Sequence, residues 1–128
     1  MAVHTEPGPL PTERIIGLAI KLHRQLGPGL LESVYHRCLC WELEHAGMPF
    51  RSEVPLAVIY EGVRMNCGYY ADIIVDDTVL LELKSVEHLL PVHKAQTRTY
   101  LRPSGCRVGL LMNFNSVLLK DDLHRFIP

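Results

Sequence analysis

The sequence predicts an α/β fold in which a mixed central β-sheet is flanked by helices. Three observations lead to this fold class. Apolar residues recur at helical spacing over residues 12–46, they alternate or run continuously from residue 54 onward, and one further helical segment separates the last strands. Three consecutive strands followed by a crossover helix and another strand require both antiparallel and parallel pairs, so the sheet is expected to be mixed.

The first helix is expected to begin at Glu13, with Thr12 as its N-terminal cap. Its apolar positions follow one helical face and are Ile15, Ala19, Leu22 and Leu26. The run Gly-Pro-Gly at 27–29 cannot continue a helix and is expected to end it.

A second helix is expected over residues 31–46 and is stopped by Gly47. Leu31, Val34 and Cys38 are spaced as one apolar face, and we expect them to point inward, with Leu39 as a further candidate. These first two helices would then cover one side of the sheet.

The remaining elements follow from alternating apolar residues and turn residues. We expect strands at 54–60, 63–75 (bulged near Gly68), 78–86 and 107–114, a helix from Pro91 to about Leu101, and a short strand within 116–128. Residues 79–83 are almost continuously apolar, so the third strand is expected at the centre of the sheet, covered on both faces. Residues 103–105 are expected to stop the last helix.

Length and composition restrict the class of protein. The chain has 128 residues, which we divide into a flexible N-terminal arm, residues 1–11 with three prolines, and a single domain, residues 12–128. A net charge of −1 argues against binding nucleic acid by charge alone. The four cysteines, the lack of a signal segment and the lack of a membrane-length apolar run predict a cytoplasmic protein with reduced thiols.

Charged side chains in the second and third strands are candidates for a metal site. If residues 76–78 form a three-residue turn, Asp72 lies opposite Glu82, and directly opposed side chains have Cβ atoms roughly 5 Å apart. Lys84 is two residues beyond Glu82 and therefore shares its face. The antiparallel pairing thus brings two carboxylates and one ammonium group together.

Two opposed carboxylates repel each other unless a cation compensates their charge, and oxygen ligands of this kind suit Mg²⁺ or Mn²⁺. A neighbouring lysine can hold or deprotonate an attacking water, or stabilise charge on a phosphate. Asp72, Glu82 and Lys84 therefore form a coherent catalytic apparatus for phosphodiester hydrolysis. A solvent-facing salt bridge is the alternative, but Glu82 and Lys84 interrupt the most apolar strand, where a charge is costly.

Five short motifs spread over nearly the whole chain add a family resemblance. They are GLLESVY at 29–35, AD at 71–72, LELKS at 81–85, QTRTY at 96–100 and VGLLMNF at 108–114. Together, and in this order, they resemble the GxxExxY proteins, small prokaryotic members of the PD-(D/E)XK nuclease-like superfamily. The resemblance implies a restriction-endonuclease-like, three-layer core and a site that uses Mg²⁺ or Mn²⁺.

The resemblance also implies roles for individual residues. Asp72 and Glu82 match the metal ligands of the family, and Lys84 matches its catalytic lysine. Glu32 matches a helix glutamate that joins the metal site in related exonuclease domains, and Tyr35, one turn later on the same face, is expected to line the site. From the residues alone, Glu32 is more simply an acid favoured by the helix dipole.

The last helix is expected to contribute further site residues. Gln96 and Tyr100 match the Q-x-x-x-Y element of the same exonucleases, Gln96 as a catalytic group that orients phosphate or bound water, and His93 shares their face. From the residues alone, a polar helix face explains them equally well. Lys94 and Arg98 lie in the only strongly positive stretch and are candidate nucleic-acid contacts, although Arg98 is turned well away from Gln96.

Two functions of different classes follow from these observations. The first is a divalent-metal-dependent nuclease that hydrolyses phosphodiester bonds of nucleic acid, with DNA as the expected substrate. The second is a catalytically silent protein of the same fold that binds nucleic acid or a protein partner. Because the chain is small and its net charge is near zero, a homodimer or a partner protein is expected to help it hold its substrate.

Overall fold

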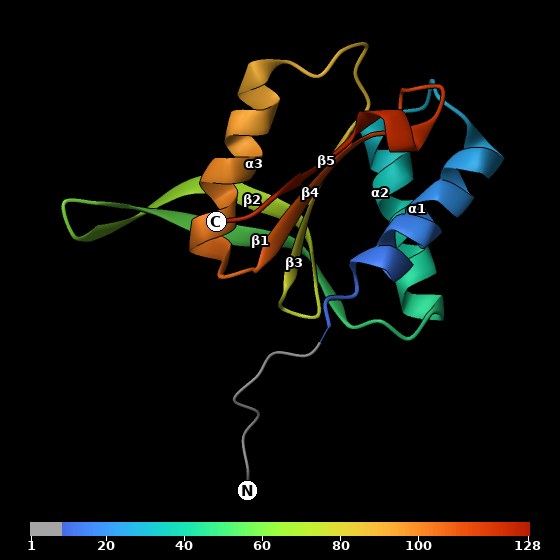
Figure 1. Ribbon diagram of the computed structural model, residues 1–128. Coiled ribbons are helices and arrows are strands. Elements are labelled where there is room, and N and C mark those ends of the chain that lie inside the picture. Colours follow the sequence, from blue (N-terminus) through green and yellow to red (C-terminus); the bar gives the residue numbers. More distant parts are fainter. Residues whose placement is uncertain (1–8) are drawn as a thin grey trace, which may run out of the picture.

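The computed structural model describes residues 9–128 and contains one five-stranded sheet with the strand order β1-β2-β3-β4-β5 (Figure 1). The expected N-terminal arm, residues 1–11, lies mostly outside the described residues, although Leu10 packs against the core. The elements are α1 (Thr12–Leu26), α2 (Glu32–His45), β1 (Phe50–Tyr60), β2 (Val63–Val75), β3 (Val79–Lys84), α3 (Pro91–Ser104), β4 (Val108–Asn113), the 3₁₀ helix η1 (Leu119–Asp122) and β5 (Leu123–Phe126).

The sheet is mixed, as predicted. Strand β3 pairs antiparallel with β2 and parallel with β4, whereas β1 with β2 and β4 with β5 are antiparallel pairs. All six residues of β3 except Lys84 are buried, which confirms the central position expected from its apolar sequence. The β1–β2 ladder shifts register between Leu56 and Val58, opposite the bulge expected near Gly68, whose φ is +76°.

Two apolar cores lie on opposite faces of the sheet. Helices α1 and α2 pack on one face, where they meet Val79, Leu81 and Leu83 of β3. Helix α3 covers the other face, where Leu80 packs with Leu101. Because side chains alternate along a strand, Glu82 lies on the α3 side, next in line after Leu80. The three-layer arrangement therefore confirms the predicted fold class and places a carboxylate under α3.

The inward face predicted for α2 is right for Leu39, which is buried, and for Cys38, which packs against the core, but wrong for Leu31 and Val34. Leu31 is 74% exposed and Val34 is 36% exposed, whereas the buried residues of α2 are Tyr35, Leu39 and Leu43. The helix carries apolar residues on more than one side, so spacing alone does not decide which side meets the core. The observed face turns Tyr35 into the interior and leaves Glu32 at the helix N-terminus.

Three element boundaries also differ from the predictions. Thr12 is the first residue of α1 and makes no capping bond, because the carbonyl of Pro11 already accepts the N–H of Ile15 (3.1 Å). Helix α3 continues through Pro103 to Ser104 before the left-handed Gly105, since a proline in the last turn removes only one backbone donor. Strand β1 begins at Phe50, because its pairing with β2 extends to Val75 although residues 50–53 do not alternate.

The described residues also bear on membrane insertion and thiol state. None of the helices formed by residues 9–128 is both long enough and apolar enough to cross a bilayer. Cys38, Cys40 and Cys106 are free thiols, as expected for reduced cysteines.

Asn113 ties together the loop after β3, the end of β4 and η1. Its side chain is 1% exposed, and its Oδ1 accepts the backbone N–H groups of Val86 (3.1 Å) and Asn115 (3.2 Å). Its Nδ2 donates to the Val86 carbonyl (2.9 Å) and to Asp122 Oδ2 (2.9 Å). The chain leaving Lys84 is therefore held by a buried, fully bonded amide.

We predict that Asn113→Ala lowers the free energy of unfolding by roughly 2–4 kcal/mol, because buried partners lose their hydrogen bonds together. Urea denaturation measures the change. The matched control is Asn115→Ala, which removes one side-chain bond to the Gly29 N–H near the surface and should cost only about 1 kcal/mol. Equal destabilisation by the two variants would show that Asn113 does not have this role.

Candidate functional site

The β2–β3 hairpin has the register that the sequence predicts. Val75 pairs with Val79 and Ile73 with Leu81 across a turn at residues 76–78. The turn is tight enough to give both Asp76 and Asp77 positive φ angles, of 52° and 54°. The regular ladder ends at Ile73 and Leu81, one position before the two carboxylates.

Beyond that point the side chain of Asp72 replaces the main chain as the partner of β3. Its Oδ2 accepts the backbone N–H of Leu83 at 2.8 Å. The backbone N–H of Asp72 in turn donates to Glu82 Oε1 at 3.4 Å. Asp72 is thereby anchored across the hairpin, and its carboxylate stands beside that of Glu82, as predicted.

Glu82 is the most perturbed acid of this site. Glu82 is only 4% exposed, and burial is the main reason that its pKa is raised to about 9. The negative charge of Asp72 contributes to this rise, and the Lys84 ammonium opposes it. A carboxylate with so few compensating groups stays protonated at neutral pH unless a cation arrives.

Glu32, the first residue of α2, faces Asp72 from the α2 side of the cleft. Burial raises its pKa, the charge of Asp72 raises it further, and Lys84 and His36 lower it. A cleft of about 440 Å³ separates α2 from the strands, and its lining residues are Glu32, Ser33, His36, Glu53, Tyr70 and Asp72. The structure therefore places both Glu32 and Glu82 within electrostatic reach of Asp72 and Lys84.

Tyr35 does not line this cleft, which corrects the prediction. Its ring is fully buried and stacks on Phe114 at a centroid distance of 4.7 Å. Its hydroxyl donates to the Gly27 carbonyl (2.5 Å) and accepts the Leu30 N–H (3.2 Å). The tyrosine clamps the turn that precedes α2, and it therefore positions Glu32 without touching the site.

Helix α3 presents Tyr100 to the carboxylates. Burial raises the pKa of Tyr100, and the charges of Glu82, Tyr69 and Asp72 raise it further. Gln96 is half-buried one turn earlier on the same face of α3, which is the arrangement expected. His93 was expected to line the site, but its Nδ1 accepts the backbone N–H of Leu90 (2.9 Å) and so caps the helix.

Lys94 and Arg98, the two basic residues expected to contact nucleic acid, differ in exposure. Lys94 is half-buried near the start of α3. Arg98 is exposed, and its guanidinium carbon lies 4.8 Å from the ring centroid of Phe126, which belongs to β5. Such cation–π contact fixes Arg98 on the β5 side of α3, away from the face that Tyr100 presents to the carboxylates.

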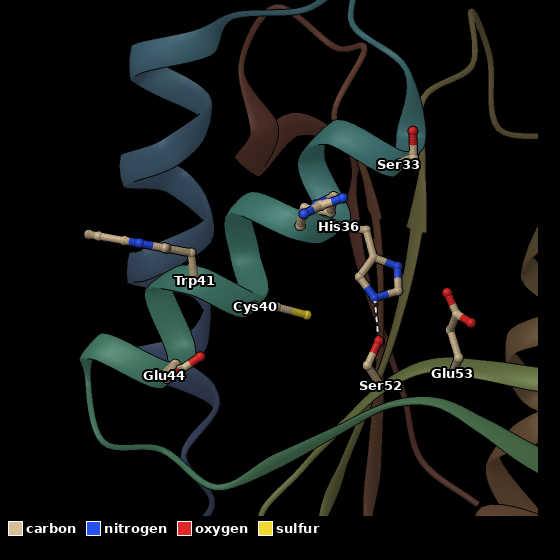
Figure 2. Close-up of a pocket in the computed structure, with 8 residues that line it drawn as sticks. Ser33, His36, Cys40, Trp41, Glu44, Ser52 and Glu53 are labelled. Carbon is tan, nitrogen blue, oxygen red and sulfur yellow. Dashed lines mark hydrogen bonds between the residues drawn. The ribbon is translucent and has the colours of Figure 1, made fainter.

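The cleft is also lined by His36 and Glu53. Figure 2 shows His36 of α2 hydrogen-bonded to Ser52 of β1, with Glu53 beside them. A second hollow of about 500 Å³ shares Ser33, His36 and Glu53 with the cleft and extends it along α2. The sequence indicates that His36 can reach the site, because it lies one helical turn after Glu32. No sequence signal marks Glu53, whose φ is +52° inside a strand.

The donor set fits a hard divalent cation bound by few protein ligands. Among residues 9–128, no three His, Cys, Asp or Glu side chains form a preassembled metal cage. Mg²⁺ does not need one, because it keeps several waters and is commonly held by one or two carboxylates. Asp72 and Glu82 supply two adjacent carboxylates, and the buried charge of Glu82 lacks a sufficient counter-charge.

A mixed sheet with an Asp on one strand and Glu-x-Lys on the next, covered by helices on both faces, defines a nuclease-like α/β protein. The chain belongs to the PD-(D/E)XK nuclease superfamily, whose family profile matches residues 10–126. No significant match is found among curated proteins or solved structures. Members of this superfamily are generally nucleases and typically use divalent metal ions.

We predict that Glu82→Gln stabilises the metal-free protein. The pKa of Glu82 is about 4.5 in the unfolded chain and about 9 in the folded protein. Between these pH values the unfolded chain releases a proton that the folded protein keeps, so folding becomes less favourable as the pH rises. Glutamine cannot ionise, so the free energy of unfolding at pH 8 should rise by on the order of 1–3 kcal/mol.

Urea denaturation at pH 8 and at pH 4.5 measures this gain, which should nearly vanish at the lower pH. Glu87→Gln, at an exposed position of the segment that follows β3, is the matched control and should change little at either pH. A Glu82→Gln protein no more stable than the wild type at pH 8 would contradict the prediction.

Proposed function

We propose that this chain is a divalent-metal-dependent nuclease that hydrolyses phosphodiester bonds, with DNA as its expected substrate. The observation that carries the proposal is the pairing of buried Glu82 with Asp72, with Lys84 two residues further on the same strand face. Two carboxylates that can hold a metal ion, beside a lysine, suit in-line hydrolysis of a phosphodiester. Superfamily membership supports the same reaction class.

Asp72 and Glu82 would hold the ion, with Glu32 facing it from α2. When bound, Mg²⁺ or Mn²⁺ supplies Lewis acidity toward the phosphate and lowers the pKa of a bound water. Lys84 places a positive charge beside the two carboxylates, where it stabilises charge developing on phosphate oxygens or orients the attacking water. Gln96 and Tyr100 can donate hydrogen bonds from α3 to the same region.

The charge of the cleft couples metal binding to substrate binding. Glu32, Glu53 and Asp72 all line it, so a phosphate backbone is repelled while the carboxylates are ionised and uncompensated. A divalent cation reverses the sign of the local field. Nucleic acid should therefore bind the cleft only together with metal.

Within the superfamily, we further propose membership of the GxxExxY group. The three motif residues have linked roles, since Gly29 allows the turn with φ +100°, Tyr35 clamps that turn, and Glu32 follows it at the cleft. A cytoplasmic location also remains our prediction, in keeping with the free thiols of Cys38, Cys40 and Cys106.

The second candidate is a catalytically silent binder of nucleic acid or protein. Arg98 favours it, because its guanidinium is engaged by Phe126 and so contributes less positive surface near the cleft than the sequence suggested. The near-zero net charge points the same way. Activity assays on the purified chain separate the two candidates.

We predict that the wild-type chain cleaves DNA in the presence of Mg²⁺ or Mn²⁺, and that Lys84→Ala lowers the rate by about 100-fold or more, because it removes charge stabilisation at the phosphate. Gel assays on single- and double-stranded DNA and RNA measure both. Lys120→Ala, at an exposed lysine of η1, is the matched control. Equal turnover by wild type and Lys84→Ala would refute catalysis at this site.

We also predict that Glu32→Gln raises the Mn²⁺ concentration needed for half-saturation about 10-fold, because a negative group facing the ion is lost. Calorimetric titration measures this even if the protein does not cleave. The matched control is Glu13→Gln, which neutralises the corresponding first-turn acid of α1. If both variants bind Mn²⁺ as the wild type does, Glu32 is only a helix N-terminal acid.

A further inference from the structure

The far end of the β1–β2 hairpin extends beyond α3 (Figure 1). We call residues 57–69 the hairpin arm. In the body of the sheet, Leu56 and Leu80 are covered by α3. Along the arm no described element continues this cover, and its large apolar side chains are exposed. The α3 side of the sheet thus runs on past the helix that shields it.

One face of the arm is apolar from base to tip. Val58 pairs with Met65 and Tyr60 with Val63, and pairs two residues apart share a face of the ribbon. Their exposed fractions are 38% for Val58, 37% for Met65, 64% for Tyr60 and 53% for Val63. Scattered exposed apolar residues are ordinary, but two adjacent cross-strand pairs form a contiguous patch.

The patch continues into an apolar groove between the arm and α3. The groove has a volume of about 300 Å³ and is lined by Leu56, Ala57, Val58, Ile59, Tyr69, Thr99, Tyr100, Arg102 and Pro103. Tyr69 lies across it from Tyr100, with ring centroids 5.6 Å apart. Arm and groove therefore form one surface that reaches from the hairpin tip to the tyrosine beside the carboxylates.

We propose that this surface is a homodimer interface, in which the hairpin arm packs against the arm and groove of a second copy of the chain. We estimate the exposed area of the two apolar pairs and Tyr69 by multiplying each exposed fraction by a whole-residue area of about 150–220 Å². The sum is on the order of 450 Å². Each side of a standard interface buries about 800 Å², of which roughly 60% is apolar. The exposed apolar area therefore matches the apolar share of one half of a stable dimer.

Charge distribution favours a second copy over nucleic acid. The arm carries Glu61 and Arg64 at its tip, and Arg102 lies at the groove, all three exposed. A surface with both signs can pair with its own copy about a two-fold axis, where the acid of one protomer meets a base of the other. A phosphate backbone would instead require a consistently positive arm.

The contact should be made by side chains rather than by adding strands at the sheet edge. Within residues 9–128, β1 has no partner on its outer side. Near its base, however, Pro55 offers no N–H and Glu53 has a φ of +52°, and both features disfavour a continuous ladder with another strand. The dimer proposal does not rest on the proposed nuclease function, since it uses none of the carboxylates, although Tyr100 lies at the border of both surfaces.

Sedimentation equilibrium on the full chain tests the proposal. We predict a mass of twice the 14.5 kDa monomer at about 100 µM, and a dissociation constant raised about 100-fold or more in Tyr60→Glu, which places a charge in the apolar face. Val117→Glu, at an 83% exposed apolar residue away from the arm, is the matched control and should remain dimeric.

Hydrogen–deuterium exchange of the wild type gives a second readout that needs no variant. Amides of residues 57–69 should become more protected as concentration rises, whereas those of α1 should not change. A wild type that is monomeric at about 100 µM, or a Tyr60→Glu dimer as tight as the wild type, would overturn the proposal. So would arm protection that appears only when DNA is added, which would make the arm a nucleic-acid contact.

Discussion

The buried carboxylate of Glu82 beside Asp72 is the constraint on which the rest of the site depends. A charge at this position cannot be solvated by water, because β3 is the central strand and α3 covers it. Asp72 cannot relieve the strain, since its own charge adds to it. The protein therefore keeps two neighbouring acids in the interior of its sheet. Replacing them with two apolar residues would raise the free energy of unfolding.

The surrounding elements are arranged to keep this unfavourable pair in place. Leu83 donates its backbone N–H to Asp72, so the end of the β-ladder fixes one carboxylate. Tyr35 fixes the turn that delivers Glu32, and buried Asn113 holds the loop that leaves Lys84. Tyr35 and Asn113 support the site without a hydrogen bond to either carboxylate, whereas the Leu83 N–H binds Asp72 directly. A site that binds a cation in one geometry needs its ligands to be held rigidly, even where their charges repel each other.

Much of the fold and the centre of the site could be predicted from sequence because both rest on local rules. Alternation and a three-residue turn determine the β2–β3 register, and the register places Asp72 beside Glu82. The orientation of α2 could not be predicted, because apolar residues lie on several of its sides and the sheet selects the face with Tyr35. Likewise, the helical period turns Arg98 away from Gln96, but only the folded chain brings Phe126 from the C-terminal strand beneath it. Glu53 lines the cleft because its φ is positive inside a strand, and no sequence pattern predicts that conformation.

A crystal structure of the protein soaked in Mn²⁺, with the ion located by its anomalous scattering, tests the central claim most directly. We predict one strong peak held by the carboxylates of Asp72 and Glu82, with Glu32 on its α2 side. Glu82 should then release the Asp72 backbone N–H that it accepts in the metal-free protein. The absence of a peak between Asp72 and Glu82 at saturating Mn²⁺, or peaks confined to surface acids such as Asp121, would contradict the assignment of this pair as a metal site.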